Sequence, residues 1–372
     1  MNITQNINFS RFVRVSFLTC SYGLTVLRSY GLIVLLFFVA TACKDEVKTE
    51  GPIGNILKND CLKYSLGPNV AGLEIEFVYA MALPPHEGFI ISASVEASIA
   101  GDDGTWMEYR SYNPNPDINN NFVTVGLPSE TIGTKTTVYF SLLDTCAAAL
   151  RYYYIIPEAA KGKEVSFTFS ATATNGETVS YPMGPYKISN MDIKHDLRLD
   201  AENCFISIAD MAVYNAAEAA ANGSNIDLVY LYRRYNATWE IVFDHAFVAP
   251  ATDPIYLPAA NSQFIPGGFI LPVGVDNDAR IRKTNELRDR HLVDIPGLPP
   301  VSQYGIYVTD EDLETLDFNG MPNFAIDMRA EGGMWIETQN RRYRAFIYIN
   351  SVTSELGNNG TAVISMKRLT MR

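Results

Sequence analysis

The chain has 372 residues, and its 41 Asp and Glu against 29 Lys and Arg give a net charge of −12 at pH 7. This acidity excludes the basic surface that nucleic-acid binding requires and argues against electrostatic docking on anionic lipid. The sequence contains 21 Tyr and 19 Phe, and both residue types favour strands. We therefore predict a β-rich protein with no nucleic-acid partner.

Residues 1–42 have the pattern of a lipoprotein signal peptide. Basic residues precede the apolar run 31–42, which ends in small residues, and Cys43 and a charged stretch follow at once. The 12 residues of this run are too few for a bilayer span of about 20 residues, but they suit the apolar part of a signal peptide. We expect cleavage before Cys43, a lipid on Cys43 that attaches the protein to a membrane, and a polar tether over 43–55. A single uncleaved anchor helix is the alternative.

The length beyond the leader suggests two domains. We place the first, a β-sandwich of immunoglobulin-like type, at 56–190. Apolar residues alternate with polar ones over 73–81, 91–99 and 165–173, as in strands with one buried face. Asn175-Gly176 then predicts a tight hairpin into 177–181, because both residues accept positive φ.

The second domain, 191–372, reads as α+β, mostly β, with one clear helix at about 207–221. Ser207 is the expected cap of this helix, Asp210 lies in its first turn, and an Ala-rich stretch ends it. Strands are expected at 226–232, 239–247, 269–275 and 362–366, a short exposed helix at 285–292, and a hairpin from 334–338 to 343–349.

Three cysteines remain beyond Cys43, at Cys61, Cys146 and Cys204. They form no CxxC motif and have no metal-ligand spacing. Cys61 and Cys146 fall in the same domain and are able to pair. The other interpretation is that all three are buried as small apolar residues.

The loop 102–122 carries Trp106, Tyr109 and Tyr112 among Asp, Asn and Pro. Exposed rings stack on sugar faces, and amide and carboxylate groups bind hydroxyls, so this loop is a candidate glycan-binding site. The alternative is that Trp106 and Tyr109 pin a long loop to the core.

No motif in the sequence assigns catalysis, a cofactor or a metal. The acidic run 310–317 begins like an EF-hand loop, but Thr315 occupies the position that requires Gly, so we expect a helix start there instead. HExxH, GxSxG and phosphate-loop motifs are absent from the sequence. We therefore predict a protein that is not an enzyme, although a hydrolase with a carboxylate pair stays as the weakest alternative.

Several segments resemble the Bacteroidota surface lipoproteins grouped as domain-of-unknown-function family 4466. These segments are 144–186, 204–233, 249–258, 288–292, 330–352 and 362–368. The resemblance implies an outer-membrane lipoprotein, and Lys44-Asp45-Glu46 is similar to signals that export such proteins to the cell exterior. It implies no catalytic residue. We expect a non-catalytic binding protein for a glycan, a lipid or another nutrient, with a structural or adhesin subunit that packs on outer-membrane partner proteins as the alternative.

Overall fold

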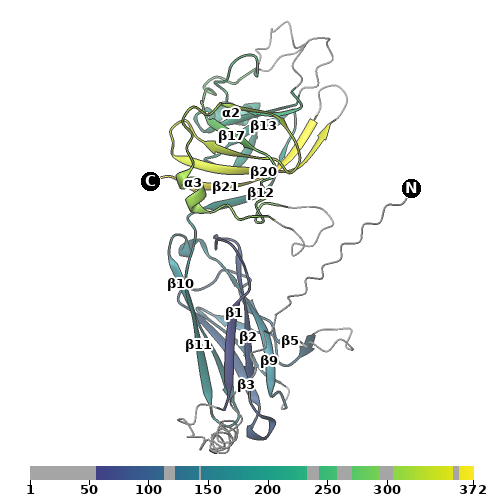
Figure 1. Cartoon of the computed structure of the whole chain (residues 1–372), viewed down its shortest axis with the longest axis vertical. Coiled ribbons are helices and arrows are strands. Elements are labelled where there is room, and N and C mark those ends of the chain that lie inside the picture. Colours follow the sequence, from purple (N-terminus) through teal and green to yellow (C-terminus); the bar gives the residue numbers. More distant parts are fainter. Residues whose placement is uncertain are drawn as a thin grey trace, which may run out of the picture. The chain divides into compact units, whose positions relative to one another are not determined.

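The computed structural model describes residues 56–112, 122–141, 144–232, 243–257, 270–293, 305–354 and 360–372. The expected signal peptide 1–42, Cys43 and the tether 43–55 lie outside these residues, as does 113–121 of the candidate loop. The described chain is mostly β, as predicted, with short helices between antiparallel strands (Figure 1). None of its described helices has the length and apolar character needed to span a bilayer.

Residues 58–187 form a sandwich of two sheets, which we call the first sandwich. Its first sheet has the order β1-β2-β9-β4, with strands β1 (Lys58–Lys63), β2 (Glu74–Ala82), β9 (Ala147–Ile155) and β4 (Trp106–Met107). Its second sheet has the order β11-β10-β3-β8-β7, with strands β11 (Thr178–Lys187), β10 (Glu164–Ala173), β3 (Ile90–Ala97), β8 (Lys135–Tyr139) and β7 (Glu130–Ile132). A separate hairpin joins β5 (Arg110–Tyr112) to β6 (Phe122–Thr124).

The first sandwich is held together by an aromatic core between its sheets. Phe77 on β2 lies 4.8 Å from Phe167 and 5.3 Å from Phe169 on β10, measured between ring centroids. Tyr154 on β9 meets Phe167 edge-on at 5.0 Å. These rings are fully or almost fully buried. The predicted alternation in β2, β3 and β10 is confirmed, since one face of each strand supplies this core.

Residues 192–370 form a second sandwich of two five-stranded sheets that share one apolar core. One sheet has the order β12-β21-β20-β19-β17, with strands β12 (Asp192–Leu199), β21 (Gly360–Thr370), β20 (Tyr343–Ser354), β19 (Gly333–Glu337) and β17 (Arg280–Thr284). The other has the order β14-β13-β15-β16-β18, with strands β14 (Ala212–Asn215), β13 (Asn203–Ser207), β15 (Leu228–Tyr232), β16 (His245–Val248) and β18 (Phe324–Met328). The predicted hairpin and closing strand correspond to β19, β20 and β21.

The prediction of a helix at about 207–221 is wrong for the first half of this range. Ser207 ends β13, and the chain then turns into β14, so helix α2 spans only Ala216–Ala221. The Ser207 hydroxyl donates to the Asp210 carboxylate at 2.8 Å and accepts the Asp210 N–H at 3.0 Å, which closes a tight turn. The same Ser-x-x-Asp spacing suits a helix cap, but Asn215 is the residue that caps α2.

Two other local predictions fail and one is confirmed. Residues 285–292 form turns and an isolated bridge instead of an exposed helix, and 270–275 is not a strand. The acidic run starts helix α3 (Asp310–Thr315), as expected, with the Thr309 hydroxyl accepting the Asp312 N–H at 3.3 Å. Short 3-10 turns occur at Pro85–Glu87, Glu158–Ala160 and Gly223–Asn225.

A fully buried ion pair lies within the second sandwich. The Lys367 ammonium on β21 donates to the Asp289 carboxylate at 2.6 Å and to the Val308 carbonyl at 2.9 Å, and neither charged side chain has any exposed surface. Asp289 also accepts the backbone N–H groups of Val308 and His291 at 2.7 and 2.8 Å. Asp289 therefore ties His291 and Val308 to β21, which explains why 285–292 does not form the expected exposed helix.

We expect Lys367→Met to destabilise the fold by about 3–5 kcal/mol, because it leaves the Asp289 carboxylate buried without its cation. Urea unfolding of the chain from residue 44 onward measures this loss. The double variant Lys367→Met/Asp289→Asn should recover part of it. The exposed Lys135 on β8 provides the control, since Lys135→Met should change stability by less than about 0.5 kcal/mol. A loss below about 1 kcal/mol for Lys367→Met would contradict the prediction.

A second buried acid in this sandwich, Asp227, forms no ion pair with any residue that the structure describes. Asp227 is 4% exposed, and its carboxylate accepts the Ile208 N–H at 3.0 Å. Burial raises the pKa of Asp227 to about 7, and the negative charge of Asp210 adds to the shift. The folded state therefore holds this proton more tightly than the unfolded state does. The resulting stabilisation is complete below pH 4 and is lost as the pH rises through 7.

We expect Asp227→Asn to remove this pH dependence, because the amide stays neutral and still offers an oxygen to Ile208. The free energy of unfolding of the wild type, relative to the variant, should fall between pH 4 and pH 8. Urea unfolding at a series of pH values measures the difference. A difference that stays constant over this range would show that Asp227 ionises normally in the fold.

Candidate functional site

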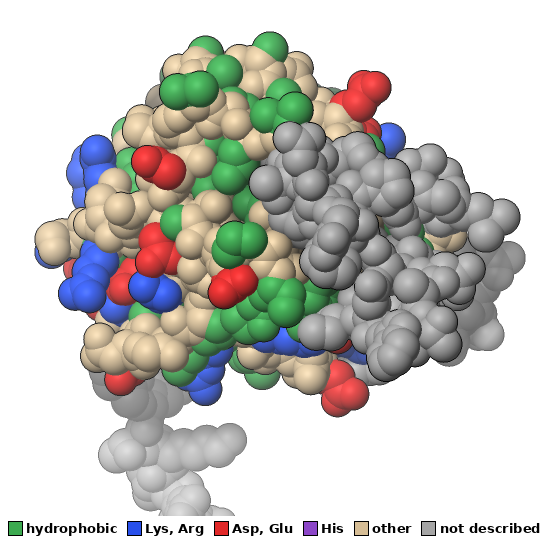
Figure 2. Space-filling view, turned by 90° about the horizontal axis from the view of Figure 1, so that it is seen from above, with side chains coloured by type: hydrophobic (Ala, Val, Ile, Leu, Met, Phe, Trp, Pro, Cys, Tyr) green, Lys and Arg blue, Asp and Glu red, His purple; other side chains and the backbone are tan. Residues whose placement is uncertain are grey.

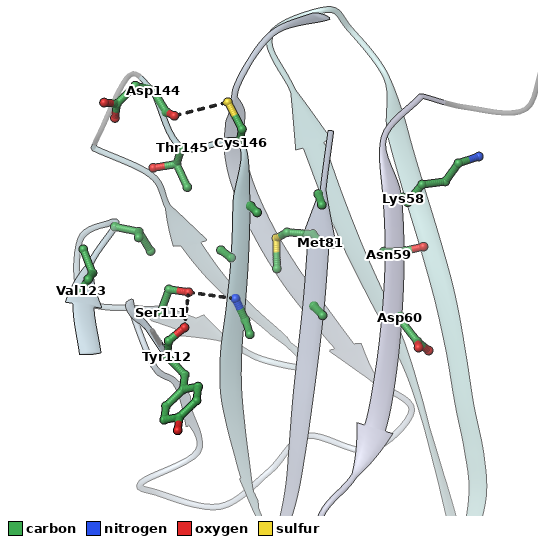
Figure 3. A pocket seen from close by; sticks show the side chains of 16 residues that line it. Lys58, Asn59, Asp60, Met81, Ser111, Tyr112, Val123, Asp144, Thr145 and Cys146 are labelled. Carbon is green, nitrogen blue, oxygen red and sulfur yellow. Dashed lines mark hydrogen bonds between the residues drawn. The ribbon is translucent and has the colours of Figure 1, made fainter. Parts of the chain in front are cut away.

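The first sandwich has a solvent-open hollow of about 730 Å³ on the outer face of its first sheet. Figure 3 shows β1 on one side of the hollow, with Lys58, Asn59 and Asp60, and β5 and β6 on the other, with Ser111, Tyr112 and Val123. Asp144, Thr145 and Cys146 lie at one end (Figure 3). The volume is within the range of small-molecule sites, which is about 300–1,000 Å³.

The floor of the hollow is made of alanine. Ala80 and Ala82 on β2 lie directly opposite Ala149 and Ala147 on β9. All four alternate with buried residues, so they face away from the aromatic core. Their small side chains leave the space that forms the hollow, while Val125 adds a further apolar surface.

The rim carries charged groups on opposite sides of this apolar floor. Lys58 and Asp60 are exposed on β1, and Asp144 is exposed at the start of β9. On the opposite wall, the Ser111 hydroxyl accepts the Ala149 N–H at 3.0 Å and so fixes the hairpin against the edge of β9. The arrangement offers apolar contact in the centre and hydrogen-bonding groups around it.

Of the three aromatic residues predicted as a binding loop, Tyr112 lines the hollow. It is 48% exposed and packs edge-on against Phe122 at 5.9 Å. Trp106 lies on β4 opposite Tyr153, with the two rings stacked at 5.1 Å, and is 38% exposed. Tyr109 packs partly buried against the core of the first sandwich, and its carbonyl accepts the N–H groups of Val125 and Gly126. Tyr109 therefore has the pinning role that was the alternative for the loop.

The three described cysteines are free. Cys61 and Cys204 are buried, and burial raises the pKa of each thiol to about 12. Cys146 is half-buried and lines the hollow, where its thiol lies 3.4 Å from the Asp144 carbonyl. The pairing of Cys61 with Cys146 is therefore not realised, and the second interpretation holds for Cys61 and Cys204.

His245 is buried and has a hydrogen-bond partner, whereas His291 is half-buried and its Nδ1 has no hydrogen-bond partner among the described residues. His245 is 2% exposed and lies 2.7 Å from the Tyr230 hydroxyl through Nδ1. Burial lowers the pKa of His245, and it lowers that of His291 to about 3, so both rings are neutral near pH 7. Within the described ranges, no group of three or more His, Cys, Asp or Glu is arranged to hold a metal ion.

Figure 2 shows a further face on which acidic and basic side chains are interspersed with apolar ones.

Comparison with known proteins assigns the family. The model of a domain of unknown function, DUF4466, matches residues 54–188, and that of a second one, DUF8576, matches residues 189–371. A crystal structure of a DUF4466 family protein from Parabacteroides merdae is 38% identical to this chain, with a TM-score of 0.73. The match covers 85% of this chain and 99% of that one. The chain belongs to the DUF4466 family.

Two bacterial surface proteins are far less similar to this DUF4466 protein. A C-terminal fragment of the major pilin GBS80 of Streptococcus agalactiae is 12% identical, over 50% of this chain and 74% of that one. The Actinomyces fimbrial adhesin FimA is 10% identical, over 83% and 95%. Both have a TM-score of 0.25, so neither likeness bears on fold or function. No protein of curated function matches the sequence.

Lys58, Asp60 and Asp144 are site residues that the sequence did not indicate. They come from separate segments, and β1 has only one buried residue, Cys61, so it shows no alternation that would predict a strand. The available signal is the pair of short runs VYAMA (78–82), with Ala at 80 and 82, and CAAAL (146–150), with Ala at 147, 148 and 149. Opposed strands with this pattern leave a depression on one face.

We expect iodoacetamide to alkylate Cys146 alone in the folded DUF4466 chain from residue 44 onward. Cys61 and Cys204 are shielded, and their raised pKa keeps them as unreactive thiols. Mass spectrometry of proteolytic fragments identifies the modified cysteine, and denaturation in urea should expose the other two. Equal labelling of Cys61 in the folded protein, or recovery of a Cys61–Cys146 disulfide, would contradict the assignment.

Proposed function

We propose that this DUF4466 protein is a non-catalytic outer-membrane lipoprotein, anchored by Cys43, that binds a glycan as a nutrient ligand at the cell exterior. The alanine-floored hollow with its charged rim is the observation that carries the proposal. Sugars have flat apolar faces edged by hydroxyl groups. The hollow offers the complementary pattern, with alanine methyl groups in the centre and Lys58, Asp60 and Asp144 around them.

Tyr112 supplies the aromatic contact that such a site requires. Its ring stands at the wall of the hollow and is exposed over 48% of its surface. Backbone hydrogen bonding fixes the strand that carries it, because β5 pairs with β6 from Arg110 to Tyr112. A ring held in this way loses little conformational entropy when it packs against a ligand.

The cellular location in this proposal follows from the leader. Cys43 after an apolar run, the charged residues 44–46 and the similarity to a Parabacteroides protein support a surface lipoprotein. β1 begins at Lys58, so about 15 residues separate the proposed lipid from the hollow.

A structural or adhesin role is the second candidate, and one feature of the same sheet favours it. Leu62 is 63% exposed and Tyr64 is 49% exposed, and both lie at or just after the outer edge strand β1. Exposed apolar groups on one face are a property of protein interfaces. Cross-linking on intact cells separates the candidates, since a stable protein neighbour without any glycan affinity would favour the structural role.

We expect the chain from residue 44 onward to bind members of an array of plant, host and microbial glycans. Tyr112→Ala should weaken binding by up to about tenfold, because an aromatic contact is worth up to about 1.5 kcal/mol. Calorimetry on the array hits gives the affinity.

The matched control is Tyr139→Ala on β8. Tyr139 is an exposed tyrosine of the second sheet, which forms no part of the hollow. This variant should bind like the wild type. If no glycan of the array binds, or if the two variants lose affinity equally, glycan binding at the hollow is ruled out.

A further inference from the structure

We infer that the ligand class is a neutral, unbranched polysaccharide held in extended form along β9, so that the hollow binds one part of a longer chain. The inference rests on the proposed function and adds a second contact region to it. This region is the exposed outer face of β9 between the hollow and the stacked rings of Trp106 and Tyr153.

The outward residues of β9 form a continuous track. They are Ala147, Ala149, Arg151 and Tyr153, which alternate with buried residues. Ala147 and Ala149 floor the hollow, whereas Tyr153 pairs with Trp106 on β4. Ala149, the floor residue nearest to Tyr153, lies four residues from it, and four residues of antiparallel strand span about 14 Å. A disaccharide in the hollow cannot reach Trp106 over this distance, and a longer extended oligosaccharide can.

The segment that follows Trp106 forms a wall along the same track. It runs antiparallel to β9, because Trp106 pairs with Tyr153, and the Glu108 N–H then donates to the Arg151 carbonyl at 2.7 Å. At the far end, the Ser111 hydroxyl accepts the Ala149 N–H at 3.0 Å. Trp106 and Tyr112 therefore stand at opposite ends of one wall, and each offers an exposed aromatic ring to the same elongated ligand.

The charges along the track favour a neutral chain. Arg151, the cation midway along it, is already paired with the Glu76 carboxylate at 3.0 Å and lies over the Tyr64 ring at 5.4 Å. At the hollow, Asp60 and Asp144 outnumber the rim cation Lys58, and the whole protein carries a net charge of −12. On the wall, Arg110 is paired with the Glu108 carboxylate at 2.7 Å. A polyanionic glycan would therefore meet a net negative rim at the hollow and, on the described part of the track and wall, cations that are already paired with acids.

The test uses neutral β-linked gluco-, xylo- and manno-oligosaccharides of two to six sugars, with oligogalacturonates as the charged series, on the chain from residue 44 onward. Calorimetry should show affinity that rises about tenfold from the disaccharide to the hexasaccharide in at least one neutral series, with none for the oligogalacturonates. Trp106→Ala should reduce hexasaccharide affinity to the level of the disaccharide and leave the disaccharide unchanged. Tyr112→Ala should weaken every length.

The outcomes separate this inference from the proposed function. Tyr112-dependent binding with no gain in affinity with chain length would overturn the extended track and leave the hollow as a glycan site. Preference for oligogalacturonates, or a Trp106→Ala variant that keeps the length dependence, would overturn it as well. The absence of binding in all series and on the glycan array would overturn both. Far-ultraviolet circular dichroism of each variant shows that the fold is retained.

Discussion

The outer face of β9 depends on the aromatic core on the other side of the same strand. Tyr152 and Tyr154 point inward and meet Phe167 at 6.2 and 5.0 Å, and this fixes which side of β9 faces solvent. Because the side-chain period of a strand is two, a slip of one residue would place these rings outside and the alanines in the core. The burial of large rings therefore holds the register against β2, and the hollow and track follow from that register.

The contrast in size between the two faces explains why a hollow forms here. The inner face of β2 and β9 carries Phe77, Tyr79, Tyr152 and Tyr154, which bury enough apolar surface to stabilise the sheet. The outer face does not have to bury apolar surface to stabilise the sheet, so alanine is tolerated at one end of it. Further along β9 the outward side chains become Arg151 and Tyr153. The face thus changes from a depression to a ridge along one strand, a shape that suits an elongated ligand better than a compact one.

The sequence predicted the strands whose two faces differ in polarity, and it also predicted β15 and β19, which are buried throughout. It did not predict β1. β2, β3 and β10 alternate clearly, whereas β1 buries only Cys61 and is held in place by pairing with β2. The helix at about 207–221 was overextended because its Ser-x-x-Asp spacing closes a β-turn as readily as it caps a helix. Tyr112 was identified because aromatic residues in a polar loop are conspicuous. Lys58, Asp60 and Asp144 were not, since they converge only through the pairing of β1, β2 and β9.

The second sandwich contains a buried ion pair, whose charges must be stabilised away from water. Lys367 and Asp289 are fully buried, and such a pair costs more in desolvation than it returns unless its geometry is fixed by further hydrogen bonds. The additional bonds of Asp289 to Val308 and His291 supply that geometry and hold these residues against β21. Separating Asp289 from Lys367 would leave a charge buried without a partner. This part of the second sandwich is therefore better suited to rigid support than to adapting its shape to a ligand.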